Sequence, residues 1–339
     1  MAAQTPIRIG LIGAGRIGTF HVSSIAQRVV GATLAMVADP APGAAQRLAE
    51  QYGARSTDDP AGLIDDPDVD AVAIAAPARF HTDLIVGAAA AGKPVWCEKP
   101  MALTLADADR AIAAAADAGM PLQVGFNRRF DAGFEAAHDA VVAGHVGTVQ
   151  LMRSLTRDPG LANPAGVPPW TIYLETLIHD FDTLAWLNPG SSPVEVFAMA
   201  DALVAPDFKD NGLLDTSVVL IRWDNGAMST AEANFSATYG YDIRAEVFGS
   251  NGMVTAGDQR STTALVFGPD GVRADTARMD TKLFVGAYTA ELQAFVDAVR
   301  NGTPPPVTGD DAKRALAIAL AAITSVQEHR PVRVDEITS

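Results

Sequence analysis

Residues 7–18 read IRIGLIGAGRIG, an apolar run that leads directly into three glycines spaced as G-x-G-x-x-G. The run over residues 7–12 predicts a buried strand, and the residues after Gly15 predict a helix. In such a strand–turn–helix unit Gly13 permits the tight turn, Gly15 lets the backbone approach a pyrophosphate, and Gly18 lets the helix pack on the strand. The N–H groups at the helix start then face the anion. The stretch therefore predicts a Rossmann unit that binds a dinucleotide.

The residue that follows the second predicted strand, Asp39, lies about 20 residues beyond the glycines, where an acidic side chain binds the adenosine ribose. Its carboxylate can accept hydrogen bonds from the ribose hydroxyls and repels a 2′-phosphate. Pro40 and Ala41 supply no cation to hold such a phosphate. We therefore expect NAD as the cofactor rather than NADP.

Two residues inside the loop, Arg16 and Ile17, belong to the predicted cofactor site. Arg16 either neutralises the pyrophosphate or is an ordinary solvated residue at the helix start. The alternative for the whole motif is that its glycines pack a tight turn in a domain that binds FAD or nothing.

The pattern of apolar and polar residues changes near residue 125. Before it, short apolar runs alternate with Ala-rich helical segments, which is typical of a parallel sheet covered on both faces. After it, longer alternating runs with Asn-Gly turns predict a mostly antiparallel sheet. We therefore expect an α/β Rossmann domain over residues 1–125 and an α+β domain over residues 126–339. The expected strands are 7–12, 33–38, 71–75, 95–97, 122–125, 150–153, 194–198, 216–222, 227–234 and 243–248, and the expected helices are 17–29, 42–52, 82–91, 105–118, 170–187, 288–300 and 310–327.

Charge and composition exclude several classes of protein. The 339 residues carry 25 Lys and Arg against 40 Asp and Glu, a net charge of −15 that repels nucleic acids and anionic membranes. The single cysteine, Cys97, allows neither an intramolecular disulfide nor a multi-thiolate zinc site. The first residues contain no apolar secretory segment, and no apolar run approaches the roughly 18 residues of a membrane span. We expect a soluble cytoplasmic protein that binds neither nucleic acid nor a membrane.

Chemically distinctive residues follow two of the predicted strands. Ligands of an open parallel sheet bind beyond the carboxyl ends of its strands. His81 follows one such end, and Glu98 and Lys99 follow another. Lys99 can donate a hydrogen bond to a substrate hydroxyl and stabilise a developing oxyanion, with Glu98 contacting the cofactor's ribose or Lys99. The alternatives are a surface Glu–Lys pair, and for His81 a helix-start contact instead of a cofactor contact.

A second group of titratable residues lies in the predicted helix 170–187. Glu175 precedes His179 by four residues and Asp182 follows it by three, so that all three can share one helix face. A neutral imidazole can accept a hydroxyl proton while a carboxylate orients the ring. The three could also ligate a divalent ion, but no further His or Cys completes a set. We expect proton transfer here and no metal.

Together these motifs resemble the glucose–fructose oxidoreductase/inositol dehydrogenase/rhizopine catabolism family, and within it the inositol 2-dehydrogenases. The likeness extends over nearly the whole chain and depends on the order of its motifs. These are GAGRIG (13–18), Asp39-Pro40, PARFH (77–81), CEKP (97–100), GFNRRFD (125–131), IHDFD (178–182), YGYD (239–242) and FGSNGM (248–253).

The resemblance implies oxidation of a ring hydroxyl of a cyclic polyol or sugar to a ketone by hydride transfer to NAD. It implies Lys99 and His179 as catalytic residues with Glu175 and Asp182 beside them. It also implies an open-faced second sheet that assembles a dimer or a homotetramer. The remaining implied contacts are Arg129 and Tyr239 to the substrate, with Arg128 and Tyr241 as near alternatives, and Pro77 and His81 to the cofactor.

Two departures from the family bear on the substrate. Glu175 stands where the inositol dehydrogenases carry Asp, and Trp170-Thr171 stands where a Gly-Gly pair is common. They leave myo-inositol, another cyclic polyol, a pyranose and a sugar acid open as substrates. Two other functions also stay open: a non-catalytic protein that senses a sugar or dinucleotide, and a sugar reductase that uses NADPH.

Overall fold

The computed structural model describes residues 5–338, which divide into two compact units. The first contains residues up to Phe130 together with Gly286–Lys313, and the second contains Asp131–Val285 and the residues from Arg314 onward. The chain therefore leaves the first unit after Phe130 and re-enters it for one segment near its end.

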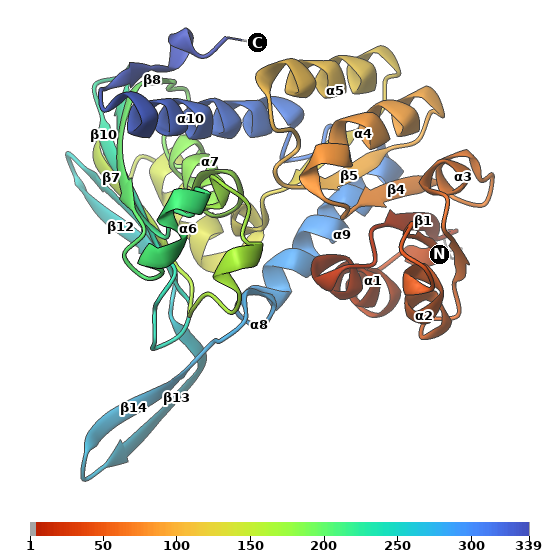
Figure 1. The fold of residues 1–339 in the computed structure, drawn as a ribbon, viewed down its shortest axis with the longest axis horizontal. Helices are drawn as coiled ribbons and strands as arrows, with labels where there is room; N and C mark the ends of the chain where they lie inside the picture. Colours follow the sequence, from red (N-terminus) through yellow and green to blue (C-terminus); the bar gives the residue numbers. More distant parts are fainter. Residues whose placement is uncertain (1–4, 339) are drawn as a thin grey trace. The chain divides into compact units, whose positions relative to one another are not determined.

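The first unit is a Rossmann domain built on a six-stranded parallel sheet of order β3-β2-β1-β4-β5-β6 (Figure 1). The central strands are buried, as their continuous apolar sequence predicts. The strands are β1 (Ile7–Ile12), β2 (Ala32–Ala38), β3 (Arg55–Thr57), β4 (Ala71–Ile74), β5 (Val95–Glu98) and β6 (Leu122–Gly125). The helices between them are α1 (Arg16–Gln27), α2 (Ala44–Glu50), α3 (Pro60–Asp65), α4 (His81–Ala90) and α5 (Leu105–Asp117).

The returning segment completes the core of this unit. Helix α9 (Val285–Asn301) places Leu292, Phe295 and Val296 in one cluster with Trp96 and the core-facing side chains of β1 and α1. Arg300 also donates a hydrogen bond of 2.7 Å to the carbonyl oxygen of Gly31 before β2. A helix from the far end of the chain therefore covers apolar surface that the N-terminal segment alone would leave exposed.

The second unit is organised by a seven-stranded mixed sheet of order β12-β11-β7-β10-β9-β8-β15. Strands β7 and β10 pair in parallel and the other neighbours are antiparallel, which confirms the expected mostly antiparallel α+β domain. The strands are β7 (Val149–Arg157), β8 (Pro193–Asp201), β9 (Thr216–Trp223), β10 (Met228–Asn234), β11 (Asp242–Gly249), β12 (Gly252–Ala256) and β15 (Val332–Arg333).

Helices cover one face of this sheet and leave the other open. The covering elements are α6 (Ala132–Val142), α7 (Ile178–Trp186) and α10 (Gly309–Glu328), which belongs to this unit from Arg314 onward. Strand β9 alternates strictly, with Val219 and Ile221 buried and Val218 and Leu220 exposed. This half-exposed alternation is typical of an antiparallel sheet with one covered face, and it agrees with the open-faced sheet that the family resemblance implies.

A hairpin of β13 (Arg260–Gly268) and β14 (Gly271–Thr276) forms a separate two-stranded sheet that extends as an arm from the second unit (Figure 1). The sequence pattern predicts neither this hairpin nor the strands β3, β12 and β15 nor the helices α3 and α6. None of the described helices combines the length and apolar character needed to cross a bilayer.

Candidate active site

The glycine loop after β1 has the geometry that the sequence predicts. Gly13 takes a φ of +107°, and a side chain there would meet the carbonyl oxygen of Ala75 at 2.5 Å. A Cβ at Gly18 would lie 1.8 Å from the carbonyl oxygen of Gly13, so α1 packs closer to the loop than any side chain allows. Gly15 is exposed and caps α1 without a side-chain hydrogen bond. The first amides of α1 are therefore arranged to receive an anion, beside exposed Arg16 and half-buried Ile17.

Asp39 follows β2 and is tied to the same loop. One carboxylate oxygen accepts the backbone N–H of Ala14 at 2.7 Å, and the other accepts that of Ala41 at 2.8 Å. Each oxygen has a second lone pair that can accept from a ribose hydroxyl. The carboxylate thus lies beside the glycine loop in a fixed orientation.

His81, at the start of α4, connects the ends of two neighbouring strands. Its Nε2 lies 2.7 Å from the carbonyl oxygen of Ala76 beyond β4, and its Nδ1 lies 2.8 Å from that of Pro100 beyond β5. Both ring nitrogens therefore face backbone carbonyls, and the ring is buried. A buried ring in this position can fix the backbone at the carboxyl edge of the sheet, where the cofactor is expected to bind. Pro77, on the same segment, is exposed.

Glu98 is the central residue at the end of β5. It is buried, and its Oε1 lies 2.7 Å from Nε2 of His21 on α1, while its Oε2 accepts the backbone N–H of Lys99 at 3.1 Å. Burial alone would raise the pKa of Glu98, but the hydrogen bond from His21 and the positive charges of His21 and Lys99 outweigh burial and lower that pKa. Glu98 is therefore a carboxylate that fixes the backbone from which the half-buried Lys99 side chain departs.

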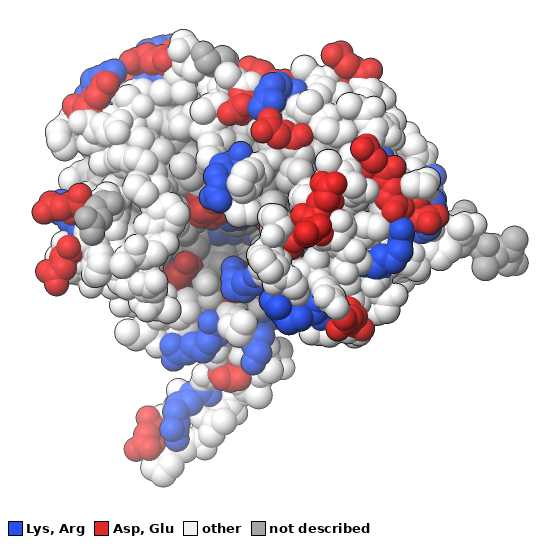
Figure 2. Space-filling view, turned by 45° about the vertical axis from the view of Figure 1, so that its right-hand side comes forward, with Lys and Arg blue, Asp and Glu red and all other residues white. Residues whose placement is uncertain are grey.

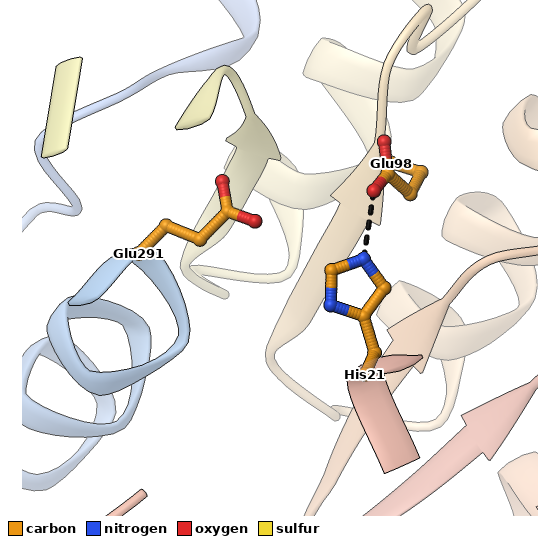
Figure 3. Close-up of side chains that lie close together, drawn as sticks. All are labelled: His21, Glu98 and Glu291. Atoms are coloured by element: carbon orange, nitrogen blue, oxygen red, sulfur yellow. Dashed lines mark hydrogen bonds and ion pairs between the residues drawn. The ribbon is translucent and has the colours of Figure 1, made fainter. Parts of the chain in front are cut away.

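A second acid, Glu291 of α9, lies beside this pair (Figure 3). Ligand-type atoms of His21, Glu98 and Glu291 all lie within 4.8 Å of one another, and the three residues are buried. Neither carboxyl oxygen of Glu291 has a hydrogen-bond partner. Burial raises the pKa of Glu291 well above its ordinary value, and the charge of Glu98 raises it further.

Cys97 plays no part in this chemistry. The thiol is completely buried on β5, where burial and then the charge of Glu98 raise its pKa. A nucleophilic cysteine needs the opposite shift. Cys97 is therefore a small buried residue of the strand.

Arg129, the predicted substrate contact of the first unit, is paired within that unit. Its guanidinium lies 3.2 Å from Oδ1 of Asp311 in the first turn of α10. Burial would raise the pKa of Asp311, but the charge of Arg129 and the hydrogen bonds of Thr308 outweigh it and lower the pKa. The pair holds Arg129 in a fixed, buried position.

In the second unit, Glu175 lies in a π-helical segment, η4 (Ile172–Leu177), and not in an α-helix. Its side chain is exposed. The segment is anchored by Tyr173, whose hydroxyl hydrogen-bonds to that of Ser217 on β9 at 2.8 Å and whose pKa burial raises to about 12. The expected helical segment 170–187 is confirmed, but its first half is π-helical and not α-helical, and this wider turn changes how Glu175 projects relative to His179.

His179 and Asp182 lie on the α-helical part, α7, three residues apart on one face. His179 is half-buried and Asp182 is buried. Between them, Asp180 points into the core and accepts hydrogen bonds from Ser154 and, at 2.7 Å, from Thr156 on β7. Asp180 therefore fixes the helix that carries His179, a role that the sequence analysis missed.

Tyr239, the other predicted substrate contact, is partly exposed, and its hydroxyl donates a hydrogen bond of 2.8 Å to Asp242 on β11. Burial would raise the pKa of Asp242, yet hydrogen bonds from Arg244, Gln259 and Tyr239 lower it. Asp242 therefore remains a carboxylate that orients the phenol.

The structure thus arranges the predicted residues in two sets. The glycine loop, Asp39, Pro77, His81, Glu98 and Lys99 lie at the carboxyl edge of the parallel sheet, and Glu175, His179, Asp182 and Tyr239 belong to the second unit. His21 and Glu291 were missed because each lies far from Glu98 in sequence. Only their burial as polar residues within apolar helices could have indicated a partner.

Comparison with known proteins matches two regions of the chain. A model described as an oxidoreductase family with an NAD-binding Rossmann fold matches residues 7–126, and that family's C-terminal alpha/beta domain matches residues 169–334. A myo-inositol 2-dehydrogenase of Thermotoga maritima is 36% identical over 98% of this chain and 99% of its own. An inositol 2-dehydrogenase of Rhizobium meliloti is also 36% identical, over 97% of this chain and 99% of its own. The crystal structure of a Lactobacillus casei scyllo-inositol dehydrogenase with bound NAD(H) and scyllo-inositol superposes with a TM-score of 0.92 at 27% identity, covering 97% of this chain and 99% of that chain.

Proposed function

Because this chain belongs to the glucose–fructose oxidoreductase, inositol dehydrogenase and rhizopine catabolism family of NAD-binding oxidoreductases, we propose that it oxidises a ring hydroxyl of a cyclic polyol to a ketone. One observation supports this most directly. The strand–glycine loop–helix unit, the ribose residue Asp39 and the Glu98–Lys99 pair all lie at the edge of the sheet where a dinucleotide binds.

The first unit fits NAD by its own geometry. Close backbone packing at Gly13 and Gly18 exposes the first amides of α1, which can hold the pyrophosphate. Asp39 presents a carboxylate to the ribose hydroxyls, and a 2′-phosphate would meet that charge at close range. When bound, NAD supplies the nicotinamide carbon that accepts a hydride.

The proposed catalytic residues divide the remaining work. Lys99 donates a hydrogen bond to the substrate oxygen and stabilises the negative charge that develops as the hydride leaves the carbon. His179 accepts the hydroxyl proton, so that the products are the ketone, the reduced cofactor and an imidazolium. Asp182, on the same face of α7, stabilises that imidazolium.

The proposed substrate contacts are Arg129 and Tyr239, and Glu175 is proposed as a further catalytic residue beside His179. Glu175 is exposed on a π turn, which is a frequent feature of functional sites. The fixed positions of Arg129 beside Asp311 and of Tyr239 beside Asp242 suit groups that must orient a hydroxyl-rich ring. The family members named above act on inositols, and a neutral cyclic polyol also suits a chain of net charge −15.

The test is the appearance of NADH when the protein is mixed with NAD and a panel of inositols, pyranoses and sugar acids. Lys99→Met and His179→Asn should each lower kcat/KM for the best substrate by at least about a hundred-fold, as expected for groups that act in the transition state. Lys93→Met, at a lysine before β5 that contacts the Asp66 carbonyl, is the control and should leave activity near that of the native protein. Native-like activity in either site variant would refute the assigned roles.

The open face of the second sheet supports assembly into a homo-oligomer, a dimer or a tetramer. Exposed side chains form a continuous apolar ladder across neighbouring strands, since Met228 is paired with Leu151, Leu151 with Phe248, and Phe248 with Met253. Such a patch is typical of protein–protein contacts. The face drawn in Figure 2 instead carries its acidic and basic groups in small patches between uncharged surface.

Assembly is measured by light scattering after size-exclusion chromatography. Leu151→Asp, in the middle of the ladder, should yield a smaller species than the native protein because the contact would bury an unpaired charge. Val30→Asp changes an equally apolar exposed residue of the first unit and should leave the mass unchanged. We further propose that the protein is cytoplasmic, because its one cysteine is a buried free thiol.

A further inference from the structure

The group of His21, Glu98 and Glu291 contains more titratable side chains than cofactor binding requires. Figure 3 shows Glu291 extending from its helix toward the His21–Glu98 pair, and the three come from α9, α1 and β5. Glu291 is completely buried and both its carboxyl oxygens lack a hydrogen-bond partner. An ionised carboxylate in that position would have no compensating contact, at a large cost in free energy.

The surroundings of Glu291 favour a proton over a charge. An oxygen of Glu98 lies within 4.8 Å of a carboxyl oxygen of Glu291, and a second negative charge at that distance in the protein interior would be strongly repelled. His21 directs Nε2 to Glu98, and its Nδ1 has no partner. Tyr288 packs edge-on against the His21 ring, and Gln123 of β6 donates its amide to the backbone carbonyl of Glu291 at 2.6 Å.

The remaining charges near the cluster act on Glu98 and not on Glu291. Lys99 and His81 both favour the ionised form of Glu98. The neighbouring thiol of Cys97 stays protonated. The cations near the cluster therefore stabilise the ionised form of Glu98, whereas burial disfavours the ionised form of Glu291.

A metal ion is a poorer occupant of this cluster than a proton. Two ligand atoms on one ion lie about 3 Å or more apart when each bond is about 2.0–2.2 Å long. Nε2 of His21 and Oε1 of Glu98 lie 2.7 Å apart, which is a hydrogen-bond distance. His21 and Glu98 are thus placed as hydrogen-bond partners and not as two ligands of one ion.

We propose that Glu291 is a neutral carboxylic acid that acts as a positioning residue for Lys99, because its retained proton leaves Glu98 as the single negative charge of the cluster. One carboxylate oxygen of Glu98 hydrogen-bonds to His21, and the other accepts the backbone N–H of Lys99. Loss of the proton from Glu291 at alkaline pH would place two carboxylates side by side. Glu98 would then be displaced, and with it the start of the Lys99 side chain.

The proposal is tested on the whole protein by infrared difference spectroscopy. The native protein at neutral pH should show the carbonyl stretch of a protonated carboxylic acid that Glu291→Gln lacks, and the band should disappear as the pH rises. Asp297→Asn removes a carboxyl group from the same helix outside the cluster and should keep the band. A native spectrum identical to that of Glu291→Gln at neutral pH would overturn the proposal, as would a stoichiometric metal ion found by elemental analysis.

The positioning role has its own readout, which rests on the proposed role of Lys99. Glu291→Gln imitates the neutral acid and should keep kcat/KM within about three-fold of the native value at neutral pH. At alkaline pH, kcat/KM of the native protein should fall over the same pH range in which the infrared band disappears. Glu291→Gln should not show this fall. An unchanged alkaline profile in Glu291→Gln would refute the positioning role.

Failure of the proposed function is recognised separately. If no polyol yields NADH, the proton on Glu291 is still tested by the infrared band, and the coupling is tested by the pH dependence of NAD binding in calorimetry. In that experiment the affinity of the native protein for NAD should fall over the same alkaline pH range in which the infrared band disappears. The affinity of Glu291→Gln should not fall over that range.

Discussion

Oδ2 of Asp39 lies 2.7 Å from the backbone nitrogen of Ala14, so the residue proposed to bind the cofactor's ribose also holds the loop proposed to bind the pyrophosphate. Replacing this carboxylate should therefore affect both halves of the dinucleotide. The charge also decides between NAD and NADP, because a 2′-phosphate would lie against it.

Asp39→Ala should weaken NAD binding by about 1.5–3 kcal/mol, on the order of ten- to a hundred-fold, because charge-assisted hydrogen bonds are lost. Asp39→Ala should also reduce the difference between the dissociation constants for NAD and NADP. Dissociation constants for both cofactors measure the effect. Asp39→Asn retains an acceptor for Ala14 but removes the charge, so it separates loop support from charge repulsion. A native protein that prefers NADP would contradict the assignment.

Two glycines of the same loop should fail in different ways. Gly18→Ala places a methyl group 1.8 Å from a backbone carbonyl oxygen and should lower the free energy of unfolding by about 1–3 kcal/mol. Gly15→Ala meets no atom within 4 Å and should fold normally, but the methyl group should obstruct the pyrophosphate. Thermal unfolding and NAD titration of both variants distinguish the two effects. Equal stability of the two variants would show that the helix–loop packing is looser than the structure indicates.

Trp170 takes a φ of +64°, a left-handed conformation that disfavours residues with a side chain. Trp170→Gly and Trp170→Ala both remove the indole, which lies near the Tyr173 ring, but only glycine relieves the backbone. The glycine variant should therefore be more stable than the alanine variant by about 1 kcal/mol, the reverse of the order in an ordinary helix. Urea unfolding of the pair measures this difference, and an alanine variant at least as stable would exclude strain at this position.

The ion pair between Arg129 and Asp311 should stabilise the first unit in a pH-dependent manner. The pKa of Asp311 in the folded protein lies below its ordinary 3.8, so its contribution is present above that pH and is lost as the pH falls through the lower, folded value. Asp311→Asn should lower the free energy of unfolding by about 1–3 kcal/mol at neutral pH, and the gap should close in acid.

The matched control for this pair is Asp310→Asn, since Asp310 is the exposed neighbour of Asp311. Asp310→Asn should leave the free energy of unfolding close to the native value from neutral pH down through the lowered pKa of Asp311, below pH 3.8. If the difference in free energy of unfolding between the native protein and Asp311→Asn persisted below the folded pKa of Asp311, packing and not charge would explain the stabilisation by this pair.

The sequence predicts those parts of the site that depend on local rules. The glycine loop, the strand that ends at Asp39 and the position of Lys99 beyond β5 all follow from short motifs and from the edge rule of parallel sheets. The half-exposed strands of the second sheet follow from alternation.

Features that depend on distant pairing were not predictable in this way. The His21–Glu98 hydrogen bond joins residues that are 77 positions apart, and no periodic pattern indicates such a contact. The π turn around Glu175 was also missed, because tertiary packing of Tyr173 against β9 overrides the regular helical pattern. Isolated hairpins such as β13–β14 have little stability of their own and give a weak sequence signal.

The segment Gly286–Lys313 has a consequence for how the protein is made. A ribosome releases the cofactor-binding strands early, yet Leu292 and Phe295 of α9 emerge only after the Asp131–Val285 part of the second unit has been synthesised. Part of the apolar surface of the first unit therefore stays uncovered until the segment Gly286–Lys313 has been synthesised. A nascent chain stalled before Val285 should be sensitive to protease in its glycine-loop unit, whereas the released protein should resist.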